Sequence, residues 1–261
     1  MNKTKIDWCD SSWNPVTGCL HDCRYCYARG IANRFSGGGE KWTDGNLFIL
    51  EKRVYAEESE KAVPYPYGFK PTFHRYRLEE YIQKSARNIF VCSMADLFGA
   101  WVPDFWIEEV FSACEKSPQH NYLFLTKNPD RYIELQEKGK LVVADNMWYG
   151  TSVTNREQLK NVKVFGELNC RTKTFLSVEP LLEDITVSDI WYDCMLSNVV
   201  AWLIIGAETG NRKSKVIPKK DWIRAIVSDC YNESIPVFMK FSITDIWGSP
   251  LVQEFPKELL R

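Results

Sequence analysis

The chain has 261 residues, of which 45% are hydrophobic and 26% are charged, values typical of a folded globular protein and not of a disordered one. The formal net charge is −1 and the pI is about 6.4, so the overall charge does not indicate nucleic-acid binding. No apolar run approaches the roughly 18 residues of a membrane span. The N-terminal segment MNKTKIDWCD lacks the apolar core of a signal peptide, so we expect a cytoplasmic protein with no membrane contact.

A cysteine-rich segment follows the first predicted strand, which lies around residues 6–13. The segment GCLHDCRYCY at residues 18–27 contains Cys19, Cys23 and Cys26, with Tyr25 directly before the last cysteine. A disulfide framework is disfavoured because such frameworks belong to small exported domains. Zinc requires a fourth ligand, and only His21 or Cys9 is near enough in the sequence to supply it.

An iron–sulfur cluster needs no fourth cysteine if its role is catalytic. Three thiolates can bind three irons of a [4Fe–4S] cluster and leave the fourth iron open to a substrate or cosubstrate. The chain contains no second C-x-x-C pair that would complete a typical zinc site. The ligand count therefore favours the cluster, with zinc as the alternative.

We expect residues 36–70 to form an insertion after the cysteine-rich segment. SGGGE at residues 36–40 indicates a flexible break, and VPYPYGFKP at residues 63–71 is rich in proline and aromatic residues. We expect this stretch to form an ordered but irregular loop that covers part of the site.

From residue 88 onward, β-rich apolar runs alternate with amphipathic stretches. The runs begin roughly 26 to 35 residues apart, about the length of a βα unit. Helical periodicity in residues 103–117 predicts a buried face that includes Phe105 and Ile107. The chain thus predicts a single α/β domain over residues 1–261, a full or partial parallel (β/α) barrel. A doubly wound sheet is the alternative, although no G-x-G-x-x-G follows the first strand. The predicted strands span 88–93, 121–126, 147–152, 173–179, 201–208 and 235–241, and the predicted helices 103–117, 155–168 and 219–233.

Polar residues follow these apolar runs. The carboxyl ends of parallel barrel strands meet at one mouth, where active sites gather. We therefore expect a ring of polar groups there, although Lys127 and Lys240 could simply neutralise Glu179 and Glu208. The expected ring contains Ser93, Asp96, Thr126, Lys127, Thr151, Ser152, Glu179, Glu208 and Lys240.

The cysteine spacing and Tyr25 resemble those of the radical S-adenosylmethionine (SAM) enzymes, in which such a loop follows the first strand of a partial barrel. Longer stretches closely resemble the phage-associated gene 37/gene 68 protein family, whose function is unassigned. These stretches are WNPVTGC (13–19), FVCSMADLF (90–98), PQHNYLFLTKNPDRY (118–132), FLSVEPLL (175–182) and IIGAETG (204–210).

The superfamily resemblance implies a reaction type. Cys19, Cys23 and Cys26 would bind a [4Fe–4S] cluster. The amino and carboxylate groups of SAM would chelate its open iron. An electron donor such as flavodoxin or ferredoxin would reduce the cluster. SAM would then be cleaved to methionine and a 5′-deoxyadenosyl radical, which abstracts a hydrogen atom from the substrate. The protein would supply geometry and exclude water.

The same resemblance suggests roles for single residues. Tyr25 would stack against the adenine of SAM. The usual G-G-E stretch is absent, and CSMADLF stands in its place. We therefore expect Ser93 and Asp96 to substitute for it and Lys127 to meet the SAM carboxylate. The remaining expected cofactor contacts are Thr151, Ser152, Asn155 and Glu179, and the expected catalytic residues are Lys127, Glu208 and Lys240.

The substrate is the least determined part of the prediction. The phage association and the basic segment NRKSKVIPKK at residues 211–220 suggest a nucleic acid or nucleotide, although a solvated face is the simpler interpretation of each basic segment. One alternative is a non-catalytic barrel, stapled by zinc or a cluster, that acts as a binding protein. Another is a cluster-dependent SAM enzyme that uses non-radical chemistry.

Overall fold

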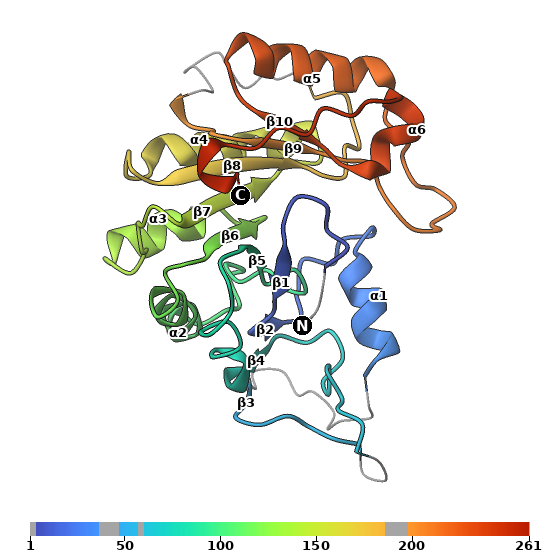
Figure 1. The fold of residues 1–261 in the computed structure, drawn as a ribbon. Coiled ribbons are helices and arrows are strands. Elements are labelled where there is room, and N and C mark those ends of the chain that lie inside the picture. The colour runs from blue at the N-terminus through green and yellow to red at the C-terminus, as the bar shows by residue number, and fades with distance from the viewer. Residues whose placement is uncertain (1–3, 37–46, 57–59, 186–197, 261) are drawn as a thin grey trace.

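The computed structural model describes residues 4–36, 47–56, 60–185 and 198–260. Seven strands form one sheet in which every neighbouring pair is parallel and the spatial order follows the sequence. The sheet is curled into a half-barrel, with β1 at one edge and β10 at the other (Figure 1). The predicted parallel (β/α) barrel is thus confirmed in its partial form. The strands are β1 (Ser11–Trp13), β5 (Asn88–Val91), β6 (Asn121–Thr126), β7 (Met147–Ser152), β8 (Lys173–Val178), β9 (Leu203–Ile205) and β10 (Val237–Met239).

Helices lie along the outside of the curved sheet in the connections between β5 and β8 and between β9 and β10 (Figure 1). The connections contain α2 (Asp104–Glu115), α3 (Asp130–Glu137) and α5 (Lys220–Asn232). The predicted helix at 155–168 is instead divided into η2 (Arg156–Leu159), α4 (Lys160–Lys163) and η3 (Val164–Glu167). In α2 the expected buried position of Phe105 is wrong, because Phe105 is 40% exposed while its neighbour Trp106 is fully buried.

Alternate strand residues fill the two faces of the sheet. Ile89 and Val91 of β5 pack in the outer core with the helices, whereas Phe90 packs in the interior. The interior is closed by large side chains from successive strands, so it forms a packed floor below the carboxyl ends. Trp8, Phe90, Leu123, Trp148, Phe175, Trp202, Ile204 and Phe238 belong to this inner cluster.

A second, three-stranded sheet lies beside the cysteine loop. It contains β2 (Val16–Thr17), β4 (Thr72–His74) and β3 (Phe48–Leu50), in that order. β3 belongs to the predicted insertion at 36–70, of which residues 37–46 and 57–59 lie outside the described part of the chain. Among the residues that the structure describes, no helix combines the length and the apolar character needed to cross a bilayer.

The remaining short elements lie near the barrel ends. Helix α1 (Tyr27–Arg34) directly follows the cysteine loop, and η1 (Arg75–Arg77) follows β4. η6 (Phe241–Ile243) and α6 (Thr244–Trp247) follow β10, and η7 (Lys257–Leu259) lies close to the C-terminus.

Candidate active site

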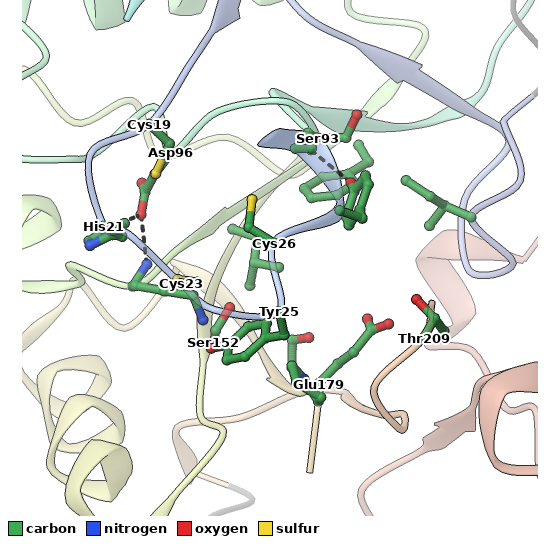
Figure 2. Close-up of a pocket in the computed structure, with 18 of the residues that line it drawn as sticks. Cys19, His21, Cys23, Tyr25, Cys26, Ser93, Asp96, Ser152, Glu179 and Thr209 are labelled. Atoms are coloured by element: carbon green, nitrogen blue, oxygen red, sulfur yellow. Dashed lines mark hydrogen bonds and ion pairs between the residues drawn. The ribbon is translucent and has the colours of Figure 1, made fainter. Parts of the chain in front are cut away.

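A pocket of about 210 Å³ lies at the carboxyl ends of the barrel strands, and the cysteine loop forms one wall (Figure 2). Eleven of the thirteen residues to which the sequence analysis assigned a metal, cofactor or catalytic role line it. The parallel topology explains this convergence, because it brings strand ends far apart in sequence to one edge. These eleven are Cys19, Cys23, Tyr25, Cys26, Ser93, Asp96, Lys127, Ser152, Glu179, Glu208 and Lys240.

Two predicted cofactor contacts do not line this pocket. Thr151 lies on β7 next to Ser152, and successive strand residues point to opposite faces. Its hydroxyl donates a hydrogen bond to the carbonyl of Thr126 at 3.2 Å. Asn155 caps η2, where its Oδ1 atom accepts a hydrogen bond from the backbone N–H of Gln158 at 3.1 Å.

The cysteine loop has a conformation that its first residue permits. Gly18 has a φ of +86°, and a Cβ atom there would lie 2.1 Å from the carbonyl oxygen of Lys70. Glycine is therefore required for the close approach of the loop to the segment before β4. At the other end of the loop, the sulfur of Cys26 accepts a hydrogen bond from the backbone N–H of Arg29 at 3.5 Å and caps α1.

The three cysteines of the loop are free thiols that line one pocket. Burial raises the pKa of Cys19 to about 12, so metal binding there must displace a proton. Within the described residues, no three or more His, Cys, Asp or Glu side chains form a ligand set for a single metal ion. Cysteines that bind different irons of a cluster need not converge on one point. The donor set of three thiols around a shared pocket therefore fits an iron–sulfur cluster.

Asp96 lies in the segment CSMADLF after β5, and its carboxylate is nearly buried. Oδ1 accepts hydrogen bonds from the backbone N–H of Phe98 at 3.1 Å and from the hydroxyl of Thr126 at 2.7 Å. Oδ2 lies 2.7 Å from His21 Nε2 and accepts from the backbone N–H of Lys127 at 2.9 Å. The carboxylate thus joins the cysteine loop to the ends of β5 and β6.

Ser93 is also engaged by neighbouring residues. Its hydroxyl donates to Asn14 Oδ1 at 3.2 Å, and its carbonyl accepts a hydrogen bond from the hydroxyl of Tyr27 at 2.8 Å. Tyr27 is a pocket residue that the sequence analysis missed. A tyrosine directly after the last cysteine of the motif was the only available signal.

Tyr25 and Lys127 form a pair on one wall of the pocket. The ammonium nitrogen of Lys127 lies 5.4 Å from the centre of the Tyr25 ring, within the range of a cation–π interaction. The Tyr25 hydroxyl makes a long contact of 3.5 Å with the hydroxyl of Thr154. The ring and the cation are thus held side by side at the edge of the cysteine loop.

The acids at the rim are paired, although not entirely as the sequence suggested. Lys240 forms an ion pair with Glu179 and lies 3.9 Å from Asp7 Oδ1. Glu208 instead receives two hydrogen bonds of 2.6 Å from the guanidinium of Arg212, four residues later. These hydrogen bonds hold the pKa of Glu208 below its usual value.

Other pocket residues came to light only in the structure. His21 lies between two of the cysteines and was considered only as a zinc ligand, yet its ring contacts Asp96 and packs edge-on against Trp101 with centroids 4.8 Å apart. The others had no distinguishing pattern in the sequence. They include Ile6, Trp8, Phe69, Ser177, Pro180 and Thr209, whereas Thr126, which also lines the pocket, was expected there as a polar strand end.

This fold is the partial-barrel fold found in radical SAM enzymes, because solved structures of spore photoproduct lyase, a member of that class, match it. The lyase complexed with dinucleoside spore photoproduct aligns with a TM-score of 0.53 at 10% identity, covering 91% of this chain and 78% of that one. A cysteine-to-serine mutant of the lyase aligns with a TM-score of 0.51, also at 10% identity and over the same shares of both chains. A third structure, a double mutant with bound AdoMet and dinucleoside spore photoproduct, has a TM-score of 0.49 and an identity of 12%. There the alignment covers 87% of this chain but 62% of the other, so this chain spans less than two thirds of that protein.

The chain belongs to a protein family described as "Protein of unknown function (DUF5131)", which it matches over residues 3–250. None of the curated proteins matches it in sequence.

Proposed function

We propose that this protein is a radical SAM enzyme in which Cys19, Cys23 and Cys26 hold a [4Fe–4S] cluster. The observation that supports this most directly is the placement of three free thiols and Tyr25 around one pocket at the mouth of a partial parallel barrel. When bound, the cluster would supply the electron that cleaves SAM to methionine and a 5′-deoxyadenosyl radical for hydrogen abstraction.

The side chains around the pocket would bind and orient SAM. The Tyr25 ring offers a flat surface for the adenine, and the neighbouring Lys127 offers a positive charge for the SAM carboxylate. Ser152 and Glu179 would contact the sugar hydroxyls. Because Asp96 already receives hydrogen bonds from its neighbours, its role in this proposal is to position the loop.

The packed aromatic floor of the barrel supports the same proposal. The inner cluster closes the barrel below the pocket, so water does not reach the site through this floor. Exclusion of water protects a reactive intermediate from side reactions. Lys240 and Glu208, both at the rim, would face the substrate, and Thr151 and Asn155 would act only by supporting the pocket wall.

We further propose a nucleic acid or a nucleotide as the substrate class. The fold likeness to a lyase that is complexed with a dinucleoside supports this choice. The sequence resemblance to the phage-associated gene 37/gene 68 family remains part of this proposal. The proposal also places the protein in the reducing cytoplasm, where flavodoxin or ferredoxin would donate the electron.

Metal analysis of anaerobically reconstituted protein tests the cluster. We expect about four irons and four sulfides per chain in the wild type. Cys23→Ala should lose most of this iron, whereas Cys170→Ala should retain it, because Cys170 is an exposed cysteine outside the pocket. Stoichiometric zinc without sulfide would instead support the non-catalytic, zinc-stapled barrel.

SAM cleavage tests the reaction type. The reduced wild-type protein should slowly release 5′-deoxyadenosine and methionine from SAM even without substrate, and Cys23→Ala should release neither. A protein that holds the cluster but gives another SAM-derived product would indicate non-radical chemistry. A protein that holds the cluster and binds SAM without any cleavage would contradict the proposal.

A further inference from the structure

The loop between β9 and α5 begins at the pocket, and after Glu208 its charged residues are all positive. Glu208 and Thr209 line the pocket, and the next acidic residue in the sequence is Asp221. Between them, residues 209–220 contain five cations and no acid. The five are Arg212, Lys213, Lys215, Lys219 and Lys220.

The pocket end of this loop is anchored by an ion pair. Arg212 is bound by both carboxylate oxygens of Glu208, whose side chain is 2% exposed. Because Glu208 neutralises the positive charge of Arg212, the net positive charge of the loop comes from its lysines. All four lysines of the loop are exposed.

Hydrogen bonds join this loop to the segment that follows β10. The backbone N–H of Ala207 donates to the hydroxyl of Ser242 at 3.0 Å, and the ammonium of Lys220 donates to the carbonyl of Trp247 at 2.6 Å. Figure 1 shows the chain after β9 as an extended orange loop beside α6. Segment 241–247 contains one acid, Asp245, and no cation, so residues 209–220 and 241–247 together carry five cations and one acid.

Two exposed aromatic rings lie near the pocket, one directly after a pocket residue and one in the pocket wall. Phe241 is 66% exposed and directly follows Lys240, a pocket residue. Tyr27 is 52% exposed and lines the pocket on the side of the cysteine loop, with its hydroxyl held by the carbonyl of Ser93. Both rings are thus accessible to a ligand that enters the pocket or lies beside it.

We infer that residues 209–220, together with Phe241 and Tyr27, form a docking surface that leads a single-stranded nucleic acid into the pocket. Lysines contact backbone phosphates without regard to sequence, and exposed aromatic rings stack on unpaired bases. Paired bases offer no free face for such stacking, and a base within a duplex must leave its helix to enter a pocket. This inference rests on the proposed function for the chemistry, but the binding surface can be tested without it.

The test is fluorescence anisotropy with the full-length protein and a labelled mixed-sequence strand of about 16 nucleotides. We expect the single strand, as DNA or RNA, to bind more tightly than the matching duplex. The double variant Lys213→Ala/Lys215→Ala should bind more weakly, and the slope of log affinity against log salt should fall by about 1.4, since each lost phosphate contact removes about 0.7.

The matched control removes two lysines from the opposite end of the barrel. Lys84 precedes β5, and Lys257 lies in η7, which packs near Asn88 at the start of β5. Both are exposed, so Lys84→Ala/Lys257→Ala changes the net charge equally and should leave affinity and salt slope unchanged. Equal losses in both double variants would show non-specific charge attraction and overturn the inference.

Stacking has its own pair of variants. Phe241→Ala should weaken single-strand binding about 5- to 100-fold. Tyr231→Ala removes a similarly exposed ring near the end of α5 and should have no effect. Binding of free nucleotides without binding of the strand would overturn the inference, as would a tighter complex with the duplex.

SAM cleavage by the same preparations separates the two proposals. A protein that cleaves SAM but does not bind the strand contradicts the docking surface alone. A protein that binds the strand but holds no cluster contradicts the radical SAM proposal alone.

Discussion

The Nε2 atom of His21 lies 2.7 Å from the Oδ2 atom of Asp96, and this contact joins the cysteine loop to the end of β5. The same carboxylate accepts hydrogen bonds from the hydroxyl of Thr126 and from backbone N–H groups in the loops that follow β5 and β6. A nearly buried carboxylate with several donors forms strong, directional hydrogen bonds. Asp96 thereby connects the residue between Cys19 and Cys23 to the ends of β5 and β6.

Asp96→Asn should weaken both the fold and the hold on the cluster. The amide offers one acceptor oxygen in place of two and turns an N–H₂ toward groups that donate. We expect a loss of about 2 to 4 kcal/mol in the free energy of unfolding. Urea unfolding would measure this loss, and iron per chain after a challenge with a chelator would measure the looser loop.

Asp221→Asn is the control for this variant, since Asp221 is 83% exposed and pairs only with nearby Arg224 at the surface. It should unfold and retain iron as the wild type does. Wild-type iron retention by Asp96→Asn would show that the carboxylate does not position the loop.

Lys127→Gln should weaken SAM binding about tenfold, the usual effect of losing one hydrogen bond to a charged group. Lys127→Arg keeps a positive charge near the Tyr25 ring and should recover part of the affinity. Tyr25→Phe should bind SAM nearly normally, because the hydroxyl makes only a 3.5 Å contact, whereas Tyr25→Ala should bind weakly. Anaerobic equilibrium dialysis with labelled SAM measures these affinities, and equal binding by all four variants would refute the assignment.

Arg212→Ala should destabilise the protein by about 3 kcal/mol, because it leaves the nearly buried carboxylate of Glu208 without its cation. The pKa of Glu208 is lowered in the folded state, so this ion pair stabilises the protein fully above the usual pKa of 4.5 and less as the pH falls below it. Denaturant unfolding between pH 3 and about pH 7 should therefore show that the difference in free energy of unfolding between the wild type and Arg212→Ala becomes smaller toward pH 3. A constant difference across that range would contradict the pairing.

Acidification should destabilise the fold through His74 of β4. Burial lowers the pKa of His74 to about 2, and its Nε2 atom lies 2.8 Å from the hydroxyl of Thr17. The unfolded chain binds a proton at His74 below about pH 6.5, and the folded chain does not. The free energy of unfolding should therefore fall by about 1.4 kcal/mol per pH unit from this residue alone as the pH drops below 6.5. His74→Gln should lack this part of the slope, and an unchanged slope would refute the prediction.

The sequence was enough to locate the strands because their apolar runs are long and evenly spaced. Strands β6 and β7 begin and end at the predicted residues. It did not distinguish the two faces of β7, where all six residues are buried and no polar alternation marks the pocket side. Ser152 and Thr151 were therefore equally good candidates, and only Ser152 lines the pocket.

The sequence by itself narrowed the choice of metal group for the loop, because the number and spacing of its thiols limit what Cys19, Cys23 and Cys26 can bind. The partners of the charged residues were decided by the tertiary structure. Glu208 pairs with Arg212, four residues away, while Lys240 pairs with Glu179, 61 residues away. Which ion pairs form depends on how neighbouring loops meet at the barrel mouth. The distances between charged side chains there cannot be read from the sequence.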